Sequence, residues 1–253
     1  MSVLGELWDR VTGTQPVPSV WIIAVSGVFA LAIVLNGSTW HVARNAITIA
    51  HEGGHALVSL LSGRKLEGIR LHSDTSGVTY SRGRGNGPGL VLTTLAGYVS
   101  PPLLGALAAW LLAAHHVTAE LWLLLALLAA TFLAIRNAYG ALAVLATAAA
   151  VCAVSLLTSP AVQAVFSYGT AWFLLFGGVR PVAELNRERA RSYRRGRAGR
   201  TDADQLARLT GLPGGAWVFV FGVVAVAALA LGARLLIPAA LHLPHIPRPT
   251  AGG

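Results

Sequence analysis

The 253-residue chain has few charged residues: Asp, Glu, Lys and Arg together make up 11% of it, where soluble domains usually carry about 25%. It has one cysteine, Cys152, which excludes an intramolecular disulfide and a zinc site built from cysteines. It also has one lysine, Lys65, so its net charge of +9 comes almost entirely from arginine. Because 55% of the residues are apolar, the chain is neither disordered nor an ordinary soluble domain.

Apolar segments of roughly 20 residues, the length that crosses about 30 Å of hydrocarbon, recur along the chain. They predict seven transmembrane helices, at residues 20–36, 40–61, 90–114, 119–135, 138–157, 161–179 and 216–237. The expected fold is therefore an all-α polytopic membrane protein, with residues 1–253 forming a single domain.

Arginine and lysine gather in the cytoplasmic loops of membrane proteins. Seven spans with a cytosolic N-terminus leave only Arg44, Arg234 and Arg248 outside. We therefore predict a multi-pass protein of the cell (inner) membrane, with its N-terminus in the cytosol and its C-terminus outside. Topology and the anionic lipid of the bilayer explain the positive charge, so no nucleic-acid partner is expected.

Two of the predicted cytosolic loops are long enough to carry structure. Residues 63–85 alternate apolar and polar side chains around a Ser-Asp-Thr-Ser-Gly turn, which predicts a β-hairpin at the membrane surface; the apolar positions are Ile69, Leu71, Val78 and Tyr80. Residues 180–214 form an Arg-rich loop that ends in a short helix, capped by Thr201 or Asp202.

The second predicted span contains the motif His51-Glu52-Gly53-Gly54-His55. Two histidines four residues apart on a helix are separated by about 40° in azimuth and about 6 Å in rise, so both can bind the same metal ion. Glu52 can then reach a water on that metal and act as the catalytic general base. Ionisable residues inside a span are costly and indicate a functional site. We predict one zinc ion per chain, on the cytosolic side of the span.

A catalytic zinc needs a third protein ligand and an open position. Only ten carboxylates are present in the chain. Asp202 and Asp204 precede the short helix before the last span and are together the preferred candidates, with Asp74 at the hairpin tip as a further alternative. Asn137, at the inner end of a span, is a candidate for binding a substrate backbone, and a helix cap is the alternative role.

Four segments of the chain resemble the site-2 protease family of intramembrane zinc metallopeptidases, in its short bacterial branch without a PDZ domain. They are the HEGGHA stretch, the hairpin that follows it, the turn at residues 95–98 and the Thr201-Asp202-Ala203 segment, and the likeness covers most of residues 40–235. In that family two histidines and a later aspartate bind zinc while the glutamate activates water. The resemblance implies these roles here for His51, His55, Asp202 and Glu52.

The resemblance also implies a reaction. The expected activity is hydrolysis of a peptide bond in or near a transmembrane segment of a membrane-protein substrate, with a single-span protein as the expected type. Because a helical backbone in lipid satisfies its own hydrogen bonds, such a substrate has to unwind before its carbonyl can reach the metal. The alternative is a membrane protein that binds metal without catalysis, such as a transporter.

Overall fold

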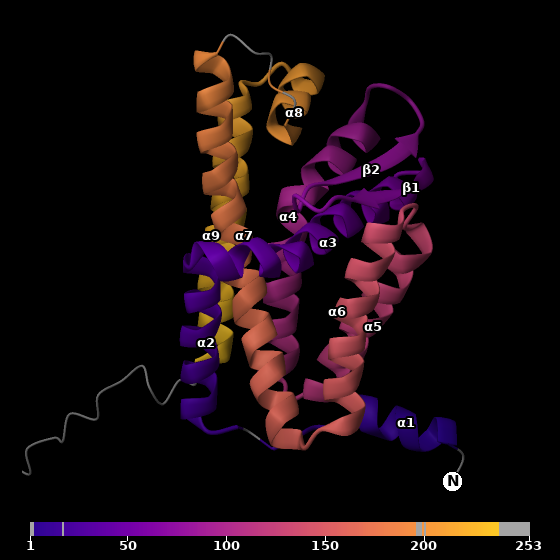
Figure 1. Cartoon of the computed structure of the whole chain (residues 1–253), viewed down its shortest axis with the longest axis vertical. Coiled ribbons are helices and arrows are strands. Elements are labelled where there is room, and N and C mark those ends of the chain that lie inside the picture. The colour runs from indigo at the N-terminus through magenta and orange to yellow at the C-terminus, as the bar shows by residue number, and fades with distance from the viewer. Residues whose placement is uncertain (1–2, 17, 196–198, 200, 238–253) are drawn as a thin grey trace, which may run out of the picture.

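A computed structural model describes residues 3–16, 18–195, 199 and 201–237. The elements follow one another as α1 (Val3–Thr12), α2 (Val20–Leu35), α3 (Gly37–Leu61), β1 (Lys65–Leu71), β2 (Gly77–Arg82), α4 (Pro88–Ala113), α5 (Val117–Ala134), α6 (Ala138–Leu157), α7 (Pro160–Arg194), α8 (Asp202–Thr210) and α9 (Gly214–Leu236). Figure 1 shows the long helices side by side, with the hairpin and α8 together at one end.

Five helices of the described chain are long and apolar enough to cross a membrane: α4, α5, α6, α7 and α9. Helices α2 and α3 reach that length and hydropathy as a pair, but they meet at an angle of 103°. The prediction of a helical, multi-pass membrane protein with one small hairpin is confirmed. The count of seven spans is not, because the structure has five such helices, or six if the bent pair is one span.

The break between α2 and α3 has a local cause. The Asn36 side chain accepts hydrogen bonds from the backbone N–H groups of Ser38 and Thr39, at 3.0 and 3.1 Å, and so caps a new helix directly after α2 ends. The bend also packs against α7, where the Arg180 guanidinium donates to the carbonyl of Val34. The apolar run predicted as the first span therefore ends at the bend, and the next helix leaves in a new direction.

The N-terminal segment lies at the end of the bundle opposite the hairpin. The backbone N–H of Gln15 donates to the carbonyl of His115 at 2.8 Å, and the Gln15 side chain accepts from the N–H of Thr118 at 3.2 Å, in the connection between α4 and α5. Figure 1 places α1 and the end of α9 away from α8 and the hairpin. The prediction that the N-terminus shares the side of the two long loops is therefore wrong. With the bent pair counted as one span, the number of membrane-capable helices is six, which agrees with α1 and the end of α9 lying at the same end of the bundle (Figure 1).

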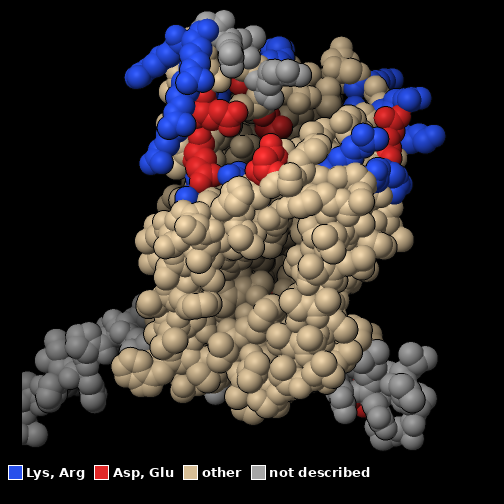
Figure 2. All heavy atoms as spheres, viewed as in Figure 1, with Lys and Arg blue, Asp and Glu red and all other residues tan. Residues whose placement is uncertain are grey.

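The Arg-rich segment predicted as a loop is largely helix. Helix α7 has 35 residues, about 52 Å at 1.5 Å per residue, so it is much longer than the roughly 30 Å of hydrocarbon. Its second half carries arginines to the end with the hairpin, where the Lys and Arg side chains on this face gather (Figure 2). Arg44, predicted to lie outside, instead pairs with Glu184 of α7 at 3.6 Å.

The hairpin lies against the helices as an antiparallel pair in which Lys65 faces Arg82 and Leu71 faces Gly77. Ile69 and Leu71 of β1 are buried, as the alternation predicts, whereas Val78 and Tyr80 of β2 are exposed. The backbone N–H of Arg136, just after α5, donates to the carbonyl of Ile69 at 2.9 Å. This contact ties the outer edge of β1 to the bundle.

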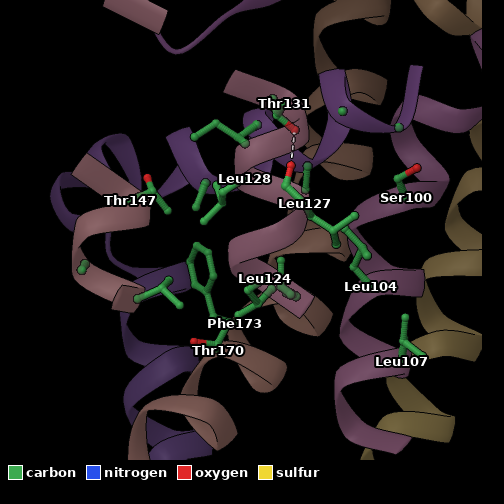
Figure 3. A pocket seen from close by; sticks show the side chains of 18 of the residues that line it. Ser100, Leu104, Leu107, Leu124, Leu127, Leu128, Thr131, Thr147, Thr170 and Phe173 are labelled. Carbon is green, nitrogen blue, oxygen red and sulfur yellow. Dashed lines mark hydrogen bonds between the residues drawn. The ribbon is translucent and has the colours of Figure 1, made fainter. Parts of the chain in front are cut away.

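An apolar cavity of about 1090 Å³ lies among helices α2 to α7. Figure 3 shows Thr131 in its wall donating its hydroxyl to the carbonyl of Leu127, at 2.8 Å, and Thr147 donates in the same way to the carbonyl of Ala143. Because these hydroxyls bond within their own helices, the cavity presents apolar surface and none of the chain's catalytic candidates.

Candidate metal centre

His51 and His55 of α3 converge with Asp202 of α8. The two histidine Nε2 atoms are 3.1 Å apart, and they lie 3.3 and 3.2 Å from Oδ2 of Asp202. Within the part of the chain that the structure describes, this is the one group of three such side chains whose ligand atoms all lie within 4.8 Å of one another. Two neighbouring turns of one helix and the first residue of another therefore form a compact set of donors.

The orientation of His55 is fixed by a second contact. Its Nδ1 lies 2.6 Å from the carbonyl oxygen of Thr93 on α4. A carbonyl only accepts, so Nδ1 carries the proton and donates. The other ring nitrogen, Nε2, faces the cluster, and a backbone carbonyl that accepts from Nδ1 is the arrangement typical of histidines that bind metals through Nε2.

The site fits a metal ion by two further observations. Oδ2 of Asp202 is buried and has no hydrogen-bond partner among the described residues, although the two histidine rings lie beside it. Gly97 of α4 faces the same point: a Cβ there would lie 2.5 Å from Nε2 of His51 and closer still to Nε2 of His55. Two imidazoles and a carboxylate around a space that glycine leaves open are suited to a divalent ion such as zinc.

Asp202 is ionised in this setting. Burial by itself would raise its pKa, but the neighbouring His55 and His51 rings outweigh burial and hold the pKa well below its ordinary value. The carboxylate is the form that binds a metal.

Glu52 lies next to the histidines and is buried under the hairpin. Its Oε2 accepts a hydrogen bond from the Thr79 hydroxyl at 2.6 Å, and the same hydroxyl oxygen lies 3.1 Å from the backbone carbonyl oxygen of Glu52. Gly77 passes so close that a Cβ there would lie 2.6 Å from Cγ of Glu52. Strand β2 therefore holds the carboxylate in place. Sequence reasoning did not find Thr79 or Gly77, because nothing in their spacing indicates contact with α3.

The two other candidate ligands are used in other ways. Asp204 pairs with Arg189 of α7 at 2.9 Å. Asp74 accepts from the backbone N–H and the hydroxyl of Ser76, at 3.0 and 2.6 Å, and these bonds lower its pKa. Of the three aspartates considered, the structure brings Asp202 to the histidines.

Asn137, the candidate for substrate binding, bonds to the hairpin. Its amide nitrogen donates to the carbonyl of Leu71 at 2.7 Å, and its amide oxygen accepts from the N–H of Leu71 at 3.2 Å. The side chain thus imitates a neighbouring strand at the edge of β1. Binding a substrate backbone through Asn137 would require these two bonds to be given up.

Comparison with known protein families agrees with this geometry. Residues 24–232 match the peptidase M50B-like family. The chain belongs to that family. The match includes α3 with its two histidines and α8 with Asp202, and it confirms the resemblance to the site-2 proteases found from the motifs. Membership of the M50B-like family indicates a metallopeptidase. Comparisons with curated proteins and with solved structures gave no match.

Proposed function

We propose that this M50B-like protein is an intramembrane zinc metallopeptidase that hydrolyses a peptide bond in or near a transmembrane segment of another membrane protein. The observation that carries the proposal is the convergence of His51, His55 and Asp202 beside the buried Glu52. The family match supports the reaction class, and the membrane-capable helices around the site support a substrate within the bilayer.

The residues of the site have separate roles in hydrolysis. His51, His55 and Asp202 would hold a zinc ion, which when bound supplies a Lewis acid that acidifies water and polarises the scissile carbonyl. Glu52 takes a proton from the attacking water while the oxygen of that water bonds to the carbonyl carbon of the substrate. Glu52 then gives that proton to the amide nitrogen as the C–N bond breaks, so one water is consumed and an acid and an amine are formed.

The position of the site limits what can be cleaved. His55 lies six residues before the end of α3, the helix that leads into the hairpin. A substrate helix within the bilayer has its carbonyls bonded internally and must unwind for one of them to reach Glu52 and the metal. We expect single-span substrates with small or helix-breaking residues near the cleaved bond.

We also propose an orientation in the cell membrane. The end that carries the hairpin, α8 and the arginine-rich part of α7 would face the cytosol, since positive residues stay on that side and interact with anionic lipid there (Figure 2). The catalytic side is then cytosolic, as the sequence predicts, and α1 lies on the opposite side.

A reconstituted assay tests the proposed function. The purified chain is placed in lipid vesicles with model single-span proteins that carry Gly or Pro in the cytosolic third of the span, and the products are mapped by mass spectrometry. We expect cleavage within or next to the span, loss of cleavage on zinc chelation and recovery on adding zinc back. Cleavage that persists after complete removal of metal would contradict the proposal, as would a zinc-loaded protein that cleaves none of the set.

A further inference from the structure

A buried ion pair joins α8 to α7 on the side of α8 away from the metal centre. Nε of Arg189 lies 2.9 Å from Oδ1 of Asp204, and the two residues are 6% and 5% exposed. The Tyr193 hydroxyl donates to the same oxygen at 3.2 Å, and the Thr201 hydroxyl donates to Oδ2 at 2.6 Å. The mechanism above uses none of these four side chains.

The surroundings leave little room for the pair to move. A Cβ on Gly214, at the start of α9, would collide with the Arg189 guanidinium, and a Cβ on Gly199 would collide with the Asp204 carboxylate. Arg189 and Asp204 are therefore held tightly between the end of α7, the start of α8 and the start of α9.

Helix geometry connects this pair to the metal centre. Asp202 and Asp204 are two residues apart on α8, which is about 200° in azimuth, so they point to opposite sides of the helix. When Arg189 holds one carboxylate against α7, the other is directed at His51 and His55. Helix α8 has nine residues, too few to be stable alone in water, so its position depends on contacts such as this one.

We propose that Arg189 and Asp204 are positioning residues that set the third metal ligand, Asp202, at bonding distance from the metal. The inference rests on the proposed function and adds to it the part of the chain that fixes the ligand. A buried ion pair stabilises a fold little more than apolar side chains would. The effect of this ion pair is instead to hold α8 in one position.

The substitution Asp204→Asn tests the proposal, because it removes the charge and keeps the shape. The matched control is Asp74→Asn, the same change at the hairpin tip. Zinc affinity of the full chain in detergent is measured by competition with a chromophoric chelator, and Co²⁺ replaces zinc to report the ligand geometry through its visible absorption. We expect Asp204→Asn to weaken zinc binding about 10- to 100-fold, as changes to groups that orient ligands usually do, and to alter the Co²⁺ spectrum. The control should do neither.

Variants of Arg189 separate positioning from general stability. Arg189→Met should weaken zinc binding as Asp204→Asn does, whereas Arg189→Lys should retain most of the affinity because it still donates to Asp204. The double variant Arg189→Met with Asp204→Asn should bind zinc about as weakly as either single variant, since the pair acts as a unit.

One result would overturn the inference, namely Asp204→Asn binding zinc as tightly as the unaltered chain. If the zinc-free form of that variant also melted at a lower temperature, the ion pair would have a structural role alone. An unaltered chain that binds no zinc would instead overturn the proposed function on which the inference rests.

Discussion

Glu52→Gln is expected to lower the rate of peptide hydrolysis about 10²- to 10⁴-fold, the usual contribution of a general base, while the chain still binds one zinc ion. Glutamine has the size of glutamate and can still accept the hydrogen bond from Thr79, so the hairpin keeps its place. It cannot take a proton from water. The rate is measured by quantifying product in the vesicle assay, and the zinc content is measured on the same preparation.

Glu67→Gln is the matched control for this prediction. Glu67 lies on β1 of the same hairpin, its side chain is 40% exposed, and it pairs with Arg82 at 2.8 Å away from the metal centre. This variant should cleave at the rate of the unaltered chain. If Glu52→Gln cleaved the same bond within about twofold of that rate, Glu52 would not be the base, and a metal-binding protein without this mechanism would be the better interpretation.

Gly97→Ala is expected to abolish metal binding, and hydrolysis with it. The added methyl would lie 2.5 Å from Nε2 of His51 and closer to Nε2 of His55, so it would occupy the space in which the ligand atoms converge. Gly97 is inside helix α4, which packs along α3, and neither backbone can shift easily. We expect zinc affinity to fall by more than about 100-fold, beyond the range typical of changes to groups that only orient ligands.

The control for Gly97→Ala is Gly169→Ala in the interior of α7. A Cβ on Gly169 would have nothing within 4 Å, so the same change there should leave zinc affinity as it is. Equilibrium dialysis against zinc measures the zinc affinity of both variants and of the unaltered chain. A Gly97→Ala protein that retains one tightly bound zinc would show that the metal lies elsewhere.

The histidine pair could be predicted because it is local. His51, Glu52 and His55 lie within two turns of one helix, and helix geometry alone brings the two rings together. Asp202 is 147 residues further along the chain than His55, so its place depended on the fold, and spacing could not separate it from Asp204. The family resemblance favoured Asp202, and in the structure Asp204 lies on the other side of α8 and pairs with Arg189.

The prediction of seven spans differs from the structure at Asn36, where α2 ends and α3 begins. By hydropathy, residues 20–61 are two apolar runs with a short polar interruption. Hydropathy gives no information about the angle between the helices that these runs form. The Asn36 cap begins α3 at 103° to α2, so the two runs form a bent pair, and the predicted side of the N-terminus changes with them. The segment at residues 95–98, predicted as a turn, lies within α4, where Gly97 permits close approach to the histidines.

The hairpin shows the same division between local and long-range information. Its alternation located both strands, and the burial of Ile69 and Leu71 agrees with that pattern. The contact of Thr79 with Glu52 could not be predicted, because it depends on how β2 lies over α3. Contacts across 27 residues of sequence, like this one, arise from packing and leave no periodic signal.

The coordination shell of the bound metal tests the account most directly. X-ray absorption at the zinc edge, on the full chain loaded with one equivalent of zinc, should show two histidine nitrogens at about 2.0–2.1 Å and carboxylate oxygen at about 2.0–2.2 Å, and Asp202→Asn should change the oxygen contribution. A shell without two histidines, or an Asp202→Asn protein with the same shell and affinity as the unaltered chain, would contradict a zinc site formed by His51, His55 and Asp202.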